Sequence, residues 1–434
     1  MRRRKSAGGR TLYHRSTLSL VLLMIVLSTE VSASNVALVA YDSNGTTSWR
    51  VVLEDQYYAQ VGALNGHTSL YVANDDYPTC ELLFFNAAGD LDASYLLDAP
   101  CYRFESTDTR WFLMDAVAID DSPWVSELSA FTPDGQQVWA KEFQDTCFEF
   151  IRAFPDDGVA VFGEGKIIRF DRNGKTLWEA NCDLSGFDVQ VSVDGETTMV
   201  ARGHDSDNGN GINTVAQFDP DGNEMWSVPF GEIDLPGFRP RMVNDREGNT
   251  FAVGDCGQDA GCLVKIDSLG NSLWSNEFVL SENGSQGVYV AVDPSGQPVV
   301  AAENDYHVAV LKYSEAGNLL WDMEISEDLT TQPGAIPDGL AIDGSGNIFL
   351  VASFCDEFGY DGCGGFAQEI VLINQNGIAL WKEWAEAADT ESTGGNPVAF
   401  VLFGGYGDPV VLSNELDSAQ SSSDDDSDSA GCGC

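Results

Sequence analysis

Residues 308–321 read Val-Ala-Val-Leu-Lys-Tyr-Ser-Glu-Ala-Gly-Asn-Leu-Leu-Trp. The first six residues are mostly β-branched or apolar, which favours a strand. The next four suit a tight turn ending at Gly317, because glycine adopts the positive φ that a type I turn with a bulge requires. The last four begin a return strand that carries Trp321 four residues after the glycine. The stretch therefore predicts a β-hairpin with a large aromatic residue on its second strand.

The same hairpin recurs along the chain at intervals of 39 to 60 residues. Its turn glycines are Gly45, Gly89, Gly135, Gly174, Gly222, Gly270, Gly317 and Gly377. All copies but one carry a tryptophan four residues after the glycine, namely Trp49, Trp139, Trp178, Trp226, Trp274, Trp321 and Trp381. The exception has Ala93 at that position. A repeat of this length, with two or more strands in each unit, indicates a β-propeller.

A second set of hairpins without the tryptophan alternates with the first. The clearest turn at residues 293–296 and 343–346, and others turn near Gly66, Gly158, Gly195, Gly248 and Gly407. The copy near residues 107–110 is degenerate. Because two hairpins supply the four strands of one blade, the count predicts an all-β propeller of eight four-stranded blades. A seven-bladed ring is the alternative if the degenerate repeat is not a full blade.

The order of the hairpins also predicts how the ring closes. The chain begins with a tryptophan hairpin at residues 36–53 and ends with a plain hairpin at about residues 396–412. These two halves would complete one blade between them. Pairing of strands from the two ends of the chain would remove the open edge of the sheet.

The repeats resemble a known family at this point. An Asp, two residues, a Gly and a Trp four positions on, as in residues 171–178, 219–226 and 267–274, are similar to the repeats of pyrroloquinoline-quinone-type propellers and of related bacterial secreted propellers. The resemblance covers nearly all of residues 36–412 and implies that the repeat tryptophans pack between neighbouring blades. The quinone enzymes of this family use a pair of adjacent cysteines and a calcium site, and this chain has no adjacent cysteine pair. The outer-membrane assembly scaffold of Gram-negative bacteria has the same fold without catalysis, so the resemblance predicts fold more than activity.

The N-terminal segment, residues 1–33, has the pattern of a secretory signal peptide. Basic residues at positions 2–5 precede an apolar run at 18–27, and Val31-Ser32-Ala33 supplies small residues for cleavage after Ala33. An uncleaved anchor is the alternative, but the run is shorter than the roughly 20 residues of a membrane span. We therefore expect an exported protein without a transmembrane span in its mature chain, located outside the cell, at the cell surface or in the periplasm. The propeller domain would cover residues 34–412.

The chain is strongly acidic, with 68 Asp and Glu against 22 Lys and Arg and a formal charge of −46. Such a surface repels nucleic acid and anionic lipid. It suits a basic partner, divalent cations or a salty medium, and a solvated acidic surface adapted to salt is the simpler interpretation.

Eight cysteines are predicted to lie on one face of the propeller, where the long connections between the second and third strands and between blades run. They are Cys80, Cys101, Cys147, Cys182, Cys256, Cys262, Cys355 and Cys363. An even number in an exported chain indicates disulfides, and the order along the chain suggests the pairs 80–101, 147–182, 256–262 and 355–363. Thiolate metal sites are the alternative, but a repeated tight Cys-x-x-Cys spacing is missing from the sequence.

Few other residues on that face point to chemistry. Asp205 and Asp207 alternate as at the start of a calcium loop, although Gly209 follows where an oxygen ligand would be expected, so a flexible polar loop is the alternative. Calcium is the one cofactor that the sequence suggests. Arg103, Arg152, Arg239 and Arg241 fall in predicted innermost strands, where pairing with neighbouring carboxylates is the expected role.

The tail, residues 413–434, differs from the rest of the chain. Residues 421–429 are all Ser or Asp, which cannot bury apolar area, so we expect disorder. The end, Gly431-Cys432-Gly433-Cys434, suggests either a covalent attachment element on a flexible stalk or a solubilising tail whose cysteines pair with each other.

These patterns predict a monomeric, exported, disulfide-stabilised propeller that acts without catalysis as an extracellular or cell-surface binding or scaffold module. The loop-rich face would bind a protein or a glycan. The alternative is an enzyme with its site at the mouth of the central channel, such as a quinoprotein-like oxidoreductase or a carbohydrate-active enzyme. No Ser–His–Asp or paired-carboxylate set can be singled out from the sequence to name a catalytic residue.

Overall fold

The described part of the chain is built from strands and turns. The computed structural model describes residues 20–28, 34–41, 47–53, 56–64, 67–74, 80–86, 90–97, 103–107, 109–117, 125–144, 148, 150–163, 165–181, 185–191, 197–204, 211–233, 240–257, 260–280, 286–303, 308–325, 335–355, 358–359, 362–363, 366–385 and 399–404. Within these ranges every regular element is a strand, and no helix is long and apolar enough to cross a membrane. The all-β fold class is therefore confirmed.

Seven four-stranded sheets each use strands from one stretch of the chain, and only in the last of them do two short strands, β30 and β31, come between members of the sheet. They are β4(Gln56–Leu64), β5(His67–Asn74), β6(Cys80–Phe85) and β7(Leu91–Leu97); β8(Arg103–Ser106), β9(Trp111–Val117), β10(Val125–Phe131) and β11(Gln137–Gln144); β12(Phe150–Ala153), β13(Val159–Gly163), β14(Lys166–Phe170) and β15(Thr176–Asn181); β16(Ser185–Val191), β17(Thr197–His204), β18(Gly211–Phe218) and β19(Glu224–Ile233); β20(Arg241–Asn244), β21(Thr250–Asp255), β22(Gly261–Ile266) and β23(Ser272–Phe278); β24(Gln286–Val292), β25(Pro298–Glu303), β26(Val308–Tyr313) and β27(Leu319–Glu324); and β28(Ala335–Ile342), β29(Ile348–Cys355), β32(Phe366–Ile373) and β33(Ala379–Ala385). A small ladder joins β30(Phe358–Gly359) to β31(Gly362–Cys363). The degenerate repeat near residues 107–110 thus forms a complete sheet, β8–β11.

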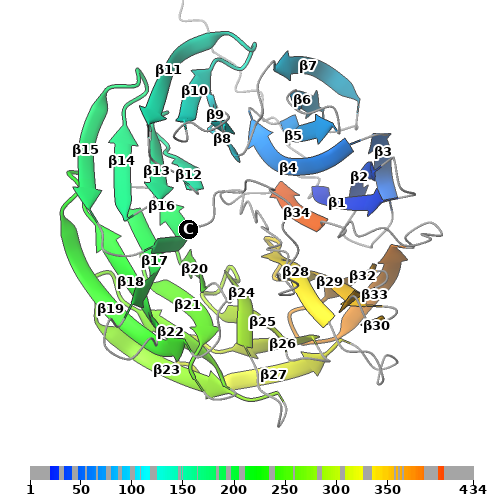
Figure 1. Cartoon of the computed structure of the whole chain (residues 1–434). Helices are drawn as coiled ribbons and strands as arrows, with labels where there is room; N and C mark the ends of the chain where they lie inside the picture. Colours follow the sequence, from blue (N-terminus) through cyan, green and yellow to red (C-terminus); the bar gives the residue numbers. More distant parts are fainter. Residues whose placement is uncertain are drawn as a thin grey trace, which may run out of the picture.

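The eighth four-stranded sheet closes the ring. Its order is β3(Thr47–Leu53), β2(Ser34–Tyr41), β1(Leu20–Ser28) and β34(Ala399–Gly404). The first strand of each sheet contacts the first strand of the next, from β4 through β28 to β34 and back to β4 (Figure 1). The chain therefore forms a propeller whose two ends meet in one sheet, and closure between N- and C-terminal strands is confirmed.

The closing sheet differs in one strand from the sequence-based prediction. Its second strand is β1, which lies inside the predicted signal peptide, rather than a strand from residues 405–412, which fall outside the described residues. The physical reason is that a continuous apolar run fits a buried central strand as well as it fits a signal peptide. Removal of residues 1–33 and the count of eight blades in a mature ring both stay predictions.

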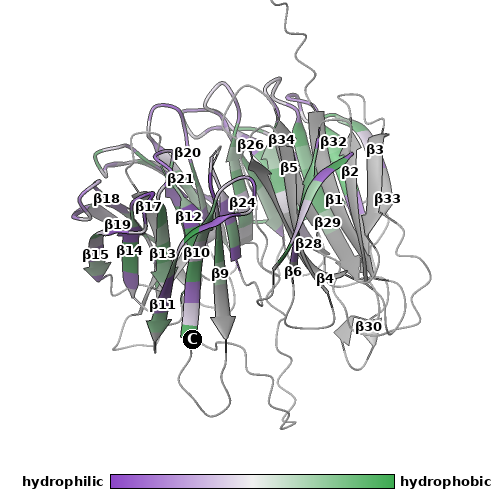
Figure 2. Ribbon diagram, turned by 90° about the horizontal axis from the view of Figure 1, so that it is seen from above, coloured by the Kyte–Doolittle hydropathy of each residue, from purple (hydrophilic) through white to green (hydrophobic). Residues whose placement is uncertain are grey.

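The hydrophobic core lies between neighbouring sheets rather than at one centre. One cluster joins Tyr289 and Val310 of one sheet to Leu340 and Val371 of the next, and equivalent clusters fill the other described interfaces between sheets. Figure 2 shows hydrophobic and hydrophilic residues interleaved along the described strands, with hydrophilic residues on several of the turns. Each sheet is therefore stabilised chiefly by its two neighbours.

The repeat tryptophans connect each blade to the turn of the next blade. A Cβ built on Gly270 would lie 2.5 Å from Cγ of Trp226, and Gly270 has φ of +82°. The Trp226 indole N–H donates to the carbonyl of Ser268, two residues before that glycine, at 3.3 Å. The same ring contact occurs at Gly174, Gly222, Gly317 and Gly377, against Trp139, Trp178, Trp274 and Trp321 respectively. In these five copies the tryptophan ring lies against the turn of the next blade, and each of the five side chains stays partly exposed.

The repeat that lacks the tryptophan uses Tyr95 instead. A Cβ on Gly135 would lie 2.4 Å from Cδ1 of Tyr95, and the Tyr95 hydroxyl donates to the carbonyl of Pro133 at 3.3 Å. Pro133 is again two residues before the turn glycine. Tyr95 lies two residues after Ala93 and so points to the same side of the strand. It replaces both the ring contact and the hydrogen bond of the missing tryptophan.

These contacts predict that the turn glycines facing an aromatic ring are more sensitive to substitution than equivalent glycines in open space. Gly296, with φ of +79°, has nothing within 4 Å of a built Cβ, and its turn has the same hydrogen bonds as that of Gly270. Gly296→Ala should lower the free energy of unfolding by about 1–2 kcal/mol through backbone strain. Gly270→Ala should cost a further ~1–3 kcal/mol, because the methyl group collides with Trp226. Urea unfolding of both variants measures the difference, and equal losses would contradict the contact.

Candidate functional site

The end of the ring that carries the short turns uses its carboxylates internally. Asp267 Oδ1 accepts hydrogen bonds from the amides of Leu269 at 2.9 Å and Asn271 at 2.8 Å. The side-chain amide of Asn271 also donates to the Asp267 carboxylate. These hydrogen bonds from the side chain and the backbone lower the pKa of the Asp267 carboxyl. The same pattern of amide donors recurs at Asp171, Asp219, Asp245, Asp293 and Asp343. These acids therefore stabilise turns and are not arranged as ligand groups.

Two of these turns, and the β12–β13 turn that contains Asp156, also pair with a buried cation inside the blade. Lys312 Nζ lies 2.8 Å from Asp293 Oδ2, with both side chains 5% exposed or less. Lys265 and Asp245 approach to 3.9 Å, and Arg169 and Asp156 to 2.6 Å. Each cation comes from the third strand of its sheet, where Arg169, Lys265 and Lys312 pair in register with a repeat tryptophan. Part of the acidic excess is thus neutralised within single blades.

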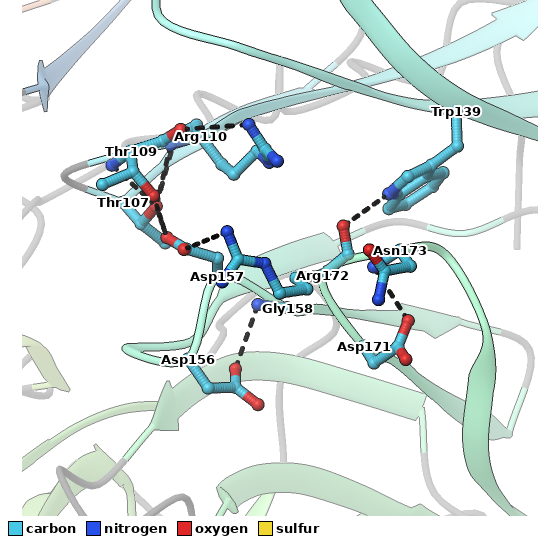
Figure 3. Close-up of polar contacts among 10 residues, drawn as sticks. All are labelled: Thr107, Thr109, Arg110, Trp139, Asp156, Asp157, Gly158, Asp171, Arg172 and Asn173. Atoms are coloured by element: carbon cyan, nitrogen blue, oxygen red, sulfur yellow. Dashed lines mark hydrogen bonds and ion pairs between the residues drawn. The ribbon is translucent and has the colours of Figure 1, made fainter.

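A polar cluster at this end ties three turns of neighbouring blades together (Figure 3). Asp157, with φ of 63°, accepts hydrogen bonds from the hydroxyls of Thr107 at 2.8 Å and Thr109 at 2.6 Å, and its carboxylate lies 3.7 Å from Arg172. Thr107 and Thr109 belong to the β8–β9 turn that looked degenerate in the sequence. That turn lacks a glycine of its own and is fixed by the carboxylate of the next blade.

A row of charges crosses the innermost strands. Arg152 of β12 makes a short ion pair with Glu105 of β8, donates from Nε to the carbonyl of Val189 at 2.7 Å, and lies 3.8 Å from Asp188 of β16. Asp188 Oδ2 in turn accepts from the amide of Met242 in β20 at 2.8 Å. One arginine and two carboxylates therefore connect four consecutive blades beside the axis of the ring.

The row is partly accessible, with side-chain exposures of 17% for Arg152, 15% for Glu105 and 6% for Asp188. Burial raises the pKa of the Glu105 carboxyl, and the opposing charge of Arg152 only partly offsets this effect. The expected pairing of inner arginines with carboxylates is confirmed for Arg152. Arg103 and Arg241 also lie on innermost strands, with their guanidinium groups 6.0 Å from the Phe150 ring and 5.6 Å from the Tyr289 ring.

The opposite end of the ring carries the connections between second and third strands, and in one of these, between β21 and β22, residues 255–257 and 260–262 are described. Cys256 and Cys262 form a disulfide with a Cα–Cα distance of 5.4 Å, as predicted. Inside the loop, the amide of Cys256 donates to the carbonyl of Ala260 at 2.8 Å and the amide of Gly257 donates to Asp255 Oδ1 at 2.9 Å. The connection between β21 and β22 is therefore closed covalently and by its own hydrogen bonds.

This connection also rests on the preceding blade. The side-chain amide of Asn213 in β18 donates to the carbonyl of Asp255 at 3.0 Å. A Cβ built on Gly231 of β19 would lie 2.4 Å from the same carbonyl and 3.3 Å from Sγ of Cys256. A side chain at position 231 would separate the two blades. The disulfide-closed loop is thus held within its own blade and against the preceding blade; we call it the braced connection.

The other sequence-predicted site residues are placed as follows. Cys80 begins β6, Cys355 ends β29 and Cys363 ends β31, and their pairing stays a prediction. Cys101, Cys147, Cys182, Asp205, Asp207, Arg239, Cys432 and Cys434 lie outside the described residues. Among the residues that the structure describes, no group of three or more His, Cys, Asp or Glu is arranged to hold a metal ion.

Sequence reasoning missed several residues that the structure brings together. It did not identify Glu105, Asp188, Asn213 or Gly231, because alternation along a strand does not show which acid or glycine faces a neighbouring blade. The one usable signal was position, since Glu105, Arg152 and Asp188 all fall on first strands of blades.

Comparison with known proteins supports the fold alone. No protein-family model matches the chain, and no curated protein matches it either. Solved structures similar to it include BamB from Moraxella catarrhalis, at 14% identity over 79% of this chain and 92% of that chain with a TM-score of 0.50. Sqt1 from Saccharomyces cerevisiae covers 81% of this chain and 95% of its own at 8% identity, TM-score 0.51, and the Dos1 propeller covers 80% and 90% at 9% identity, TM-score 0.51. Of these neighbours, BamB and Dos1 are β-propellers, and the specific quinone-type resemblance is not confirmed by the comparison.

The charge row predicts a strong effect of removing its cation. Arg152→Met should lower the free energy of unfolding by about 2–4 kcal/mol, because it leaves Glu105 and Asp188 without their shared partner in a mostly buried position. Arg172→Met is the matched control, since its 55%-exposed side chain pairs with Asp157 only at 3.7 Å. That control should stay within about 0.5 kcal/mol of the parent in urea unfolding. Equal changes in the free energy of unfolding for the two variants would show that the charge row does not stabilise the fold.

The pH dependence of Arg152→Met should identify Glu105 as the stranded group. Burial already raises the folded-state pKa of Glu105, and loss of Arg152 removes the charge that lowers it. A raised folded pKa means that the folded state binds the proton more tightly, so stability grows as pH falls from above that pKa towards the ordinary value of a Glu carboxyl. The deficit measured at pH 7 should therefore shrink in acid, and Glu105→Gln in the same background should abolish this recovery.

Reduction of the disulfide should loosen the loop-rich end without unfolding the blades. Opening this short loop should cost roughly 2–3 kcal/mol by the chain-entropy account. With reductant, amide hydrogen exchange should accelerate at residues 255–262, while the far-UV circular dichroism of the sheets stays unchanged. Cys256→Ser/Cys262→Ser is the control, whose exchange in this segment should not respond to reductant. Unchanged exchange in the parent protein would show that the disulfide does not hold the loop.

Proposed function

We propose that the protein is an exported, non-enzymatic propeller that binds a protein partner through its loop-rich end and acts as a scaffold. The proposal joins the export signal predicted in residues 1–33 to the geometry of the two ends of the ring. At the turn end, the polar side chains form hydrogen bonds and ion pairs that stabilise the turns themselves, whereas the opposite end carries the long connections. Binding residues are commonly found on such connections when a rigid scaffold positions them.

The observation that carries the proposal is the braced connection at residues 255–262. The Cys256–Cys262 bond closes the loop, and contacts to Asn213 and Gly231 seat it on the neighbouring blade. A surface element held in one conformation loses little entropy when it binds, which raises affinity for a fixed set of contacts. A disulfide in a chain with an export signal also fits an oxidising compartment.

The charge row beside the ring axis supports the scaffold in preference to the enzyme. A catalytic site would need carboxylates or basic groups that are free to act on a substrate. Arg152 is instead engaged by Glu105, Asp188 and the carbonyl of Val189, and Asp188 also accepts from Met242. Each of these groups contributes to joining the blades, which is a structural role.

The charge of the chain defines the kind of protein partner that fits. With a formal charge of −46, the surface attracts a partner with a basic face and steers its approach at low salt. Affinity should therefore fall as ionic strength rises, with the on-rate more affected than the off-rate. A glycan partner without positive charge would not show this salt dependence.

The test compares the two ends of a single blade in the same protein. A photo-crosslinking amino acid is placed at Gln258, in the β21–β22 connection, or at Glu247, an exposed residue of the β20–β21 turn at the opposite end. Both variants are produced from the full chain in a host that exports it, and cross-linked products are identified by mass spectrometry.

We expect a defined, salt-sensitive adduct with a protein at position 258 and none at position 247. The adduct should weaken when Cys256 and Cys262 are both replaced by serine, because the loop is then no longer held in the binding conformation. Equal labelling at both positions, or an adduct that does not depend on the disulfide, would refute a partner site at the loop-rich end.

A further inference from the structure

The closing sheet contains a strand, β1, that lies within the predicted signal peptide. β1 lies between β2 and β34, and it pairs with β2 over residues 21–28 and with β34 over residues 20–25. If residues 1–33 are cleaved, the hydrogen-bonding groups of β2 and β34 that face β1 lose their partners. The result would be a place one strand wide in the middle of a sheet, which is costly because backbone groups there have no other partners.

A segment near the C-terminus has the sequence of a strand that would fit this place. The hairpin between β24 and β25 contains Gly296-Gln297-Pro298-Val299-Val300, and residues 407–411 read Gly-Asp-Pro-Val-Val. With the two stretches aligned, Val292 at the end of β24 corresponds to Phe403 in β34. β25 begins at Pro298, so an equivalent strand would begin at Pro409 and continue through Val410, Val411 and Leu412.

The pairing register of β1 agrees with this alignment on the side of β34. In the β24–β25 ladder, Val299 pairs with Ala291. The aligned residues are Val410 and Leu402. In the structure, the residue that pairs with Leu402 is Leu22 of β1. Val410 would therefore take the position of Leu22.

The register agrees independently on the side of β2. Val299 pairs with Lys312, and Lys312 pairs with the repeat Trp321. In the closing sheet the residue opposite the repeat Trp49 is Ala40, and Ala40 pairs with Leu22. Both neighbours thus assign the position of Leu22 to Val410. The polarity agrees as well, because β1 runs antiparallel to β34 and to β2, as β25 does to β24 and β26.

We propose that residues 409–414 are the second occupant of this place and that they replace β1 when the N-terminal segment is removed. Before cleavage, residues 20–28 complete the closing sheet. After cleavage, the C-terminal segment continues from β34 through a tight turn and pairs with β34 and β2 in the register of β1. The proposal rests on removal of the N-terminal segment but not on the partner or the site of the proposed function.

The test uses the full chain with a specific protease site introduced within residues 29–33, so that cleavage is made in vitro and does not depend on export. Amide hydrogen exchange is followed by mass spectrometry before and after the cut. Before the cut, residues 20–28 should be protected and residues 410–414 should exchange like the Ser/Asp-rich tail. After the cut, the N-terminal fragment should leave, and exchange at residues 410–414 should slow by roughly 100-fold.

Two proline variants distinguish strand exchange from simple loss of a strand. Val411→Pro removes a donor from a strand that would be paired on both edges, so it should lower the melting temperature of the cut protein and leave the uncut protein unchanged. Asp424→Pro in the tail is the control and should change neither form. Three outcomes would each overturn the proposal. The cut protein could retain the N-terminal fragment, or the amides of residues 410–414 could exchange as fast as those of the tail after the cut. Val411→Pro could also leave the melting temperature of the cut protein unchanged, as the control does.

Discussion

The contact between an aromatic ring on the last strand of one blade and the turn glycine of the next blade is the constraint on which the ring depends. Two separate reasons require glycine at this position, as at Gly270. Its φ is positive, and a Cβ would collide with the aromatic side chain of the preceding blade, here Trp226. The indole N–H then bonds to the carbonyl two residues before the glycine. The geometry of the turn, the spacing between blades and the length of the sequence repeat must therefore all be compatible with this one contact. A change in turn length would move the glycine away from the ring and leave a half-buried indole without its acceptor.

The excess of acidic residues has a structural component that the net charge conceals. Carboxylates such as Asp267 fix turns by accepting backbone amides, and Asp293 and Asp245 neutralise the buried ammonium groups of Lys312 and Lys265. Such groups are committed to the fold and are poor candidates for ligands. The charge that remains for a partner lies on residues outside these turns and pairs. This distribution makes the two ends of the ring unequal, because the turn end is organised by its own side chains and the opposite end needs covalent bracing at Cys256–Cys262.

The sequence predicted the parts of the fold that repeat and missed the parts that replace the repeat. The tryptophan register predicted hairpins and their positive-φ glycines, because both depend on local turn chemistry at a fixed spacing. The packing between blades was implied by the family resemblance. Tyr95 was not recognised as a substitute for the tryptophan that is missing at position 93, since the equivalence becomes visible only when the Tyr95 ring contacts Gly135. The β8–β9 turn looked degenerate because its stabilising group, Asp157, belongs to another blade. Contacts between blades, including the Glu105–Arg152–Asp188 row, depend on which side of a strand faces inward and were not readable from composition.

The closing sheet shows why two segments of one chain can suit the same position. A strand in the second place of a blade is covered by sheets on both faces and paired on both edges, so its sequence is a short continuous apolar run. The apolar part of a signal peptide meets the same description for a different reason, since it must enter a hydrophobic environment during export. Residues 20–28 satisfy both requirements, and their register against Ala40 and Leu402 is the one that Val410 would adopt. Closure by the N-terminal segment is therefore not evidence against its removal. The physical requirement is that some apolar strand fills the position, and the chain carries one on each side of the propeller.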